Sequence, residues 1–117
     1  DPVFSSGVFL ALKSGTMLAD EVDKALSVGP VNAQSFEQYG KRMQSSIETM
    51  RKIVYAFYDP QFSFGDLVKR GDHLRASLTD CLIGNVDDQD FKELFESMSD
   101  LARLPDPVEH GLAKTSA

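Results

Sequence analysis

Apolar residues in the first part of the chain recur at the three- and four-residue steps of an α-helix. The pattern predicts a helix over about 7–26, with Ser5 or Ser6 as the N-cap and Gly29-Pro30 as the stop. The apolar residues that set this spacing are Val8, Leu12, Met17 or Leu18, Val22 and Leu26. The segment therefore has the periodicity of an amphipathic helix.

A second face of the same segment carries small residues at every fourth position. They are Gly7, Ala11, Gly15 and Ala19. Each glycine inside a soluble helix costs about 1 kcal/mol relative to alanine. We therefore expect this face to contact another backbone or a flat ligand closely, and a partner outside the chain could provide that contact.

The longest helix is predicted over 32–59, where Asn32 or Ser35 can act as the N-cap and Asp59-Pro60 ends the pattern. Its apolar stripe consists of Phe36, Tyr39, Met43, Ile47, Met50, Val54 and Phe57. The basic residues of the same segment are Lys41, Arg42, Arg51 and Lys52. We interpret them as part of a solvated face and assign them no function.

Two shorter helices are predicted over 72–84 and 88–102, after a turn-like stretch that follows Pro60. Asp72 can cap the first and Gly84 can end it, and Asp87 or Asp88 can begin the second. Their apolar residues are Leu74, Leu78, Cys81 and Leu82, then Phe91, Leu94, Phe95, Met98 and Leu101. No strand-like alternation is present, so the chain is predicted to be all-α, with about four helices in one domain over 1–104 and a poorly ordered tail over 105–117.

The net charge of the chain disfavours some classes of binding partner. Eighteen acidic and twelve basic residues give a net charge of −6, which disfavours nucleic acid and anionic membranes. The longest apolar run, 8–12, is far shorter than the roughly 20 residues that cross a bilayer. A single cysteine, Cys81, excludes an intrachain disulfide and favours the cytoplasm.

The segment 1–7 is the strongest candidate for chemistry. Pro2 favours an extended entry, and Ser5, Ser6 and Gly7 precede the first helix. The first amides of a helix lack intrahelical acceptors and carry the positive end of its dipole. Amides at Ser6 and Gly7 could therefore bind a halide, a phosphate or an electron-rich flavin edge, although a purely structural cap has the same sequence.

The stretch Asp-Pro-Val-Phe-Ser-Ser-Gly-Val-Phe-Leu-Ala-Leu-Lys-Ser-Gly over 1–15 closely resembles a segment of the flavin-dependent halogenases. Related flavin monooxygenases and geranylgeranyl reductases share it. Tyr-Ala-Phe-Tyr-Asp-Pro over 55–60 resembles the helical C-terminal region of halogenases more loosely. Phe9 stands where halogenases often have histidine, so the resemblance also fits a more general flavin oxidoreductase.

The resemblance implies that the chain is the C-terminal helical part of a larger FAD-binding protein with a Rossmann-type fold, and that 1–27 lies next to the flavin. Backbone at Pro2, Val3, Ser5, Ser6 and Gly7 would line the isoalloxazine. Amides of Ser6 and Gly7 would match those that hold chloride in halogenases. The Gly-Asp, the dinucleotide fingerprint and the catalytic lysine of the family are absent from this sequence, so no catalytic residue is assigned here.

The remaining candidates for chemistry are weaker. Neither histidine, His73 or His110, has metal-ligand spacing with Cys81, so no metal site is predicted. Five aromatic residues could line a pocket for an aromatic substrate, but core packing is the favoured interpretation. These residues are Tyr55, Phe57, Tyr58, Phe62 and Phe64.

Two functions remain open. In the first, the missing N-terminal FAD-binding part is the partner, because the chain opens on Asp1-Pro2 without an initiator methionine and enters an apolar segment at once. The fragment alone is then expected neither to retain FAD nor to be active. In the second, the chain is a non-catalytic helical interaction module. A second copy of the fragment, forming a homodimer, is a partner that would fit both functions.

Overall fold

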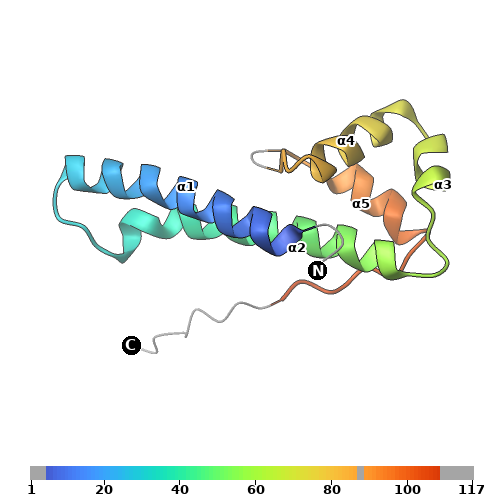
Figure 1. The fold of residues 1–117 in the computed structure, drawn as a ribbon, viewed down its shortest axis with the longest axis horizontal. Helices are drawn as coiled ribbons and strands as arrows, with labels where there is room; N and C mark the ends of the chain where they lie inside the picture. The colour runs from blue at the N-terminus through green and yellow to red at the C-terminus, as the bar shows by residue number, and fades with distance from the viewer. Residues whose placement is uncertain (1–4, 87–88, 109–117) are drawn as a thin grey trace.

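The computed structural model describes residues 5–86 and 89–108, and within them it is all-helical with no strand. In Figure 1 the long helices lie side by side and the short ones are gathered at one end of the pair. The elements in chain order are α1 (Ser6–Val28), the 3-10 helix η1 (Ala33–Phe36), α2 (Glu37–Tyr58), α3 (Phe64–Lys69), α4 (Asp72–Leu82) and α5 (Lys92–Ser99). The predicted fold class is confirmed at this level.

Helices α1 and α2 run antiparallel, with the turn around Gly29 between them (Figure 1). The Ser14 hydroxyl and the Tyr39 hydroxyl are hydrogen-bonded at 2.6 Å across the pair. Asn32 caps η1, since its side chain accepts from the amides of Gln34 and Ser35 while the Ser35 side chain accepts from the Asn32 amide. The predicted 32–59 helix is therefore a 3-10 turn followed by α2.

The predicted N-cap position of the first helix is correct, but no side-chain cap forms there. Ser5 occupies the N-cap position of α1 in a left-handed conformation, with φ 51°, and its side chain makes no capping hydrogen bond. The predicted N-cap of the 72–84 helix is wrong. Asp72 is the first helical residue of α4, and Gly71 precedes it as the N-cap.

The turn-like stretch after Pro60 contains a helix that the sequence pattern did not predict, α3. The Ser63 side chain accepts a hydrogen bond from the Asp66 amide at 3.3 Å, which satisfies one of the free donors of its first turn. Leu67, in the middle of α3, is fully buried. The short helix therefore contributes directly to the core.

The core lies between the C-terminal half of α2 and the three short helices. Its largest fully buried side chains include Ile53, Leu67, Leu94 and Met98. On α2 the buried residues are Met43, Ser46, Thr49, Met50, Ile53 and Ala56. The predicted stripe is thus only partly correct, because Phe57 is exposed and Ile53 and Ala56 take its place.

The two predicted short helices keep most of their apolar stripes. Leu74, Leu78 and Cys81 of α4 are buried, but Leu82 is exposed. Helix α5 is shorter than the predicted 88–102, and its buried residues are Leu94, Phe95 and Met98. The predicted starts at Asp87 or Asp88 lie outside the described residues.

Part of the predicted tail has defined contacts. Residues 105–108 are not helical, but they lie along α2, where the Arg51 guanidinium donates to the Asp106 carbonyl at 3.3 Å. The Val108 amide donates to Glu48 Oε1 at 3.4 Å. The amide of Arg103 donates to Asp59 Oδ2 at 3.0 Å, and this bond, together with one from the Gln61 amide, lowers the pKa of the Asp59 carboxyl.

The predicted 72–84 helix ends at Leu82 with Ile83 as its C-cap, and Gly84 is the left-handed residue that follows the cap. Its φ is 81°, and the amides of Gly84 and Asn85 donate to the carbonyls of Cys81 and Asp80, which is a Schellman motif. The Phe9 ring of α1 lies where a Cβ of residue 84 would be. Only glycine satisfies both the backbone conformation and this contact.

We therefore expect Gly84→Ala to lower the free energy of unfolding by about 2 kcal/mol, since it adds left-handed strain and displaces Phe9. Gly40→Ala is the control, because Gly40 lies in α2 with open space around its Cβ position. That change should stabilise the chain by about 1 kcal/mol. Urea denaturation followed by circular dichroism measures both, and an equal effect of the two changes would contradict the contact with Phe9.

Candidate functional site

The beginning of α1 holds the residues that the sequence singled out. The first backbone hydrogen bond of the helix runs from the Phe9 amide to the Ser5 carbonyl at 3.0 Å. The amides of Ser6 and Gly7 belong to the first turn, where a helix provides no acceptor for them. No acidic residue lies in this turn. The turn therefore keeps the positive character that an anion or a flavin edge requires.

Ser6 and Gly7 differ in exposure. Ser6 is buried, whereas Gly7 is exposed with open space at its Cβ position. Pro2 and Val3, which were predicted to line the flavin with them, lie outside the described residues. The structure thus places three of the five predicted residues, Ser5, Ser6 and Gly7, at one helix end.

A cavity of about 370 Å³ adjoins this helix end. It lies between the first turns of α1 and the end of α4, and its lining is mainly apolar. The lining residues are Ser5, Val8, Phe9, Leu12, Met50, Leu82, Ile83 and Gly84. Of the three predicted site residues that the structure describes, Ser5 lines this cavity, and Ser6 and Gly7 do not.

Helix α1 exposes a continuous apolar face, which we call the outward face. All of its members are exposed: Gly7, Val8, Ala11, Leu12, Gly15, Leu18, Ala19, Val22 and Leu26. Val8, Leu12 and Leu26 are 65%, 70% and 70% exposed. The outward face combines most of the predicted apolar stripe with the column of small residues.

The opposite face of α1 is apolar as well. Phe9 and Leu10 pack against the core, and Met17 is half-buried. A helix that is apolar on both sides is typical of a helix enclosed by protein on both sides. Within the described residues, α2 covers one side of α1, and the outward face is exposed, with Val8 and Leu12 bordering the cavity beside the end of α4.

The aromatic cluster divides into two parts. Phe62 and Phe64 pack against the core with their ring centroids 4.8 Å apart, edge to face, and Phe57 lies 6.3 Å from Phe64. For Phe62 and Phe64, core packing is therefore confirmed. Tyr55 and Tyr58 are exposed and line a shallow depression with Pro60 and Arg103.

Cys81 and His73 do not form a reactive pair. Cys81 is fully buried, and burial, with a smaller contribution from Asp80, raises the pKa of its thiol to about 12. A protonated, buried thiol is a poor nucleophile and a poor metal ligand. His73 is exposed, and its Nε2 lies 3.1 Å from the Glu93 carboxylate. The described residues contain no group of three or more acidic, histidine or cysteine side chains that could hold a metal ion.

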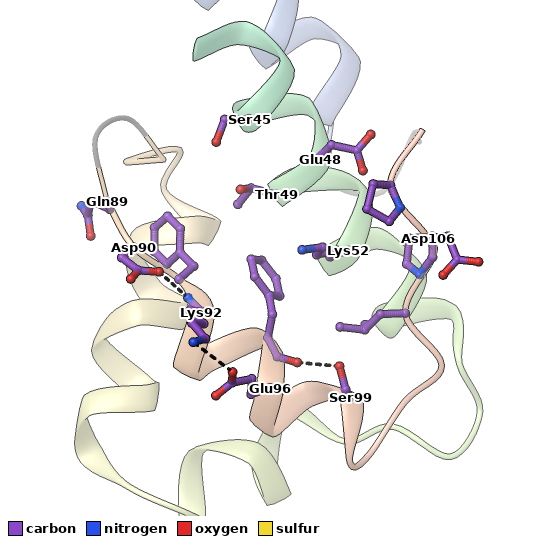
Figure 2. Close-up of a pocket in the computed structure, with 15 residues that line it drawn as sticks. Ser45, Glu48, Thr49, Lys52, Gln89, Asp90, Lys92, Glu96, Ser99 and Asp106 are labelled. Atoms are coloured by element: carbon purple, nitrogen blue, oxygen red, sulfur yellow. Dashed lines mark hydrogen bonds and ion pairs between the residues drawn. The ribbon is translucent and has the colours of Figure 1, made fainter. Parts of the chain in front are cut away.

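A second cavity, which sequence reasoning missed, lies between α2, α5 and the segment 104–107 (Figure 2). Its volume is about 610 Å³. Ser45, Thr49 and Lys52 line it from successive turns of α2, and Phe91 and Phe95 line it from the beginning of α5. From the sequence, Lys52 was interpreted only as part of a solvated face, and Ser45 and Thr49 carried no prediction.

The basic residues of α2 are thus only partly solvated. Lys41 is exposed and pairs with Glu37. Arg51 is partly buried and bonds the Glu48 carboxylate at 2.7 Å, and the Lys52 ammonium lies 4.6 Å from the centroid of the Phe95 ring. The interpretation as a solvated face holds for Lys41 and is wrong for Arg51 and Lys52.

No protein-family model, curated protein or solved structure matches the chain. Among the helices that the structure describes, none combines the length and the apolar character that crossing a bilayer requires. Fold and surface geometry are therefore the observations from which a function can be argued.

Proposed function

We propose that this chain is the C-terminal helical portion of an FAD-dependent oxidoreductase of the flavin-dependent halogenase or monooxygenase type. It packs against the flavin-binding part of the same protein through α1. The observation that carries the proposal is the outward face, an uncovered apolar surface on a helix whose other side is already packed against α2.

The small residues of the outward face support a close contact rather than a loose one. Gly7 and Gly15 have no heavy atom within 4 Å of their Cβ positions. The described chain therefore offers no packing reason for either glycine, although each costs about 1 kcal/mol relative to alanine. A sheet or a flat cofactor against this face would provide the reason.

The N-terminal end of α1 also supports packing of the outward face against a flavin. Ser5, Ser6 and Gly7 lie where the outward face begins, and the amides of the first turn point out of the helix end. A flavin ring seated there would meet positive amide dipoles at its electron-rich edge. In a halogenase, the amides of Ser6 and Gly7 would also hold the halide. FAD belongs to the complete protein, and the fragment supplies scaffold rather than catalytic residues.

The proposal is tested by reading the coding sequence upstream of Asp1 and expressing the longer product. We expect a Gly-x-Gly-x-x-Gly fingerprint upstream, a yellow purified protein with bound FAD, and no saturable FAD binding by residues 1–117 alone. Flavin absorbance and a fluorescence titration measure these properties.

The alternative is a helical interaction module whose outward face binds a second copy of the chain. A start codon directly before Asp1, together with a concentration-dependent dimer in sedimentation, would favour that function and would overturn the flavoprotein proposal. Tight FAD binding by residues 1–117 alone would contradict both, since the adenine and pyrophosphate sites would then have to lie within this chain.

A further inference from the structure

The cavity between α2 and α5 has the dimensions of a small-molecule site. Its volume of about 610 Å³ falls within the usual range of ligand pockets. Figure 2 shows Ser45, Thr49 and Lys52 along α2 on one side and the beginning of α5 on the other. The segment around Pro105 forms a third wall. The cavity is distinct from the helix end of α1 that the proposed function uses.

Thr49 is the first indication of a ligand. The residue is 8% exposed, and its side chain lines the cavity. Its hydroxyl makes no hydrogen bond to any residue that the structure describes, although Thr16 and Thr79 each bond the carbonyl four residues earlier. The hydroxyl oxygen itself is reached by water, so a polar group of a ligand in the cavity could replace that water.

Lys52 is the second indication. Its ammonium lies over the Phe95 ring, 4.6 Å from the centroid, and no carboxylate of the described residues lies within ion-pair distance of it. The electron-rich face of the ring stabilises the positive charge only in part. A carboxylate on a ligand would form an ion pair with the ammonium, and the Thr49 and Ser45 hydroxyls could donate further hydrogen bonds to it from the same helix face.

The carboxylates around the cavity do not compete strongly for Lys52. Glu48 pairs with Arg51, Asp90 Oδ1 accepts from the Lys92 amide at 2.8 Å, and Glu96 lies 3.8 Å from the Lys92 ammonium. Figure 2 shows the Asp106 carboxylate at the rim, directed away from Lys52. These acidic groups nevertheless make the rim unfavourable for a multiply charged anion.

The remaining lining sets the shape of the ligand. Phe91 and Phe95 offer aromatic surface to the cavity, and Leu104 and Pro105 offer aliphatic surface. An apolar body would be desolvated between these walls while its anionic end reaches the ammonium. We propose that this cavity binds a small monocarboxylate with an apolar body, held by Lys52 and Thr49. The proposal needs only residues of this chain and does not depend on the proposed function.

The test uses residues 1–117 and three probes of one shape: benzoate, benzyl alcohol and benzylamine. In amide ¹H–¹⁵N NMR titrations, benzoate should shift the signals of residues around 45–52 and 91–95, with a Kd on the order of 1 mM. Benzyl alcohol and benzylamine should bind at least tenfold more weakly. Equal binding of all three probes, or benzoate shifts located elsewhere, would overturn the proposal.

Two substitutions examine the named residues separately. Lys52→Met keeps a long side chain against Phe95 but removes the charge, and it should weaken benzoate binding at least tenfold. Thr49→Val should weaken it several-fold without lowering the melting temperature, because the hydroxyl has no protein partner to lose. Lys41→Met is the control on the same helix and should leave Kd unchanged. Unchanged benzoate affinity in Lys52→Met, with a native circular dichroism spectrum, would refute the site.

Discussion

Leu67→Ala is expected to lower the free energy of unfolding by about 3 kcal/mol. Leu67 is 0% exposed and belongs to the core cluster between α2 and the three short helices. Removing its side chain leaves a cavity that a six-residue helix, fixed between Ser63 and Arg70, cannot close by a small shift. Because a domain of this size is stable by only about 5–15 kcal/mol, the loss is a large fraction of the total.

The matched control is Leu12→Ala, which makes the same chemical change on the outward face of α1. Leu12 is 70% exposed, so the change should alter stability by less than about 0.5 kcal/mol. Urea denaturation of both variants at low protein concentration measures the difference. If Leu12→Ala cost as much as Leu67→Ala, the outward face would be covered in the isolated chain, and self-association would be the first explanation to examine.

Gly15→Leu should have opposite effects in the chain and in the longer protein that we propose. Within residues 1–117 the change should stabilise by roughly 0.5–1 kcal/mol, because leucine is a better helix former and the space around Gly15 is open. In the longer protein the added side chain would stand between α1 and the flavin-binding part. We expect the purified protein to lose at least nine-tenths of its bound FAD.

Gly40→Leu provides the comparison, because Gly40 is also an exposed helical glycine with open space at its Cβ position, but on α2. It should stabilise the chain to a similar degree and leave the FAD content of the longer protein unchanged. The ratio of flavin to protein absorbance measures the outcome. Equal FAD content in both variants would show that the outward face does not pack near the cofactor.

The short helix α3 shows where periodicity stops being informative. Six residues complete fewer than two turns, so no apolar repeat can develop between Pro60 and Gly71. The local signal was nevertheless present, since Ser63 and Asp66 have the spacing of a helix start. Helix α5 is the opposite case, because its apolar repeat suggested a longer helix than the eight residues that form.

The two candidate sites also differ in how far the local sequence could predict them. The beginning of α1 could be selected from its local sequence, since serine, glycine and a helix start are all short-range features. The cavity between α2 and α5 could not, because Lys52 meets Phe95 only after the chain has turned back through α3 and α4. A contact between residues 43 positions apart has no local sequence signature.

The sequence by itself determined the helical class, a cap at Asn32 or Ser35, the glycine after α4 and most of the buried stripes of α4 and α5, because these depend on interactions within a few turns of one helix. Only the tertiary structure decided which face of α1 is covered. Both faces of α1 are apolar, so the hydrophobic pattern could not show which of them is buried. The packing of Phe9 and Leu10 against the core and of Ser14 against Tyr39 of α2 leaves Val8, Leu12 and Leu26 exposed on the opposite side of the helix.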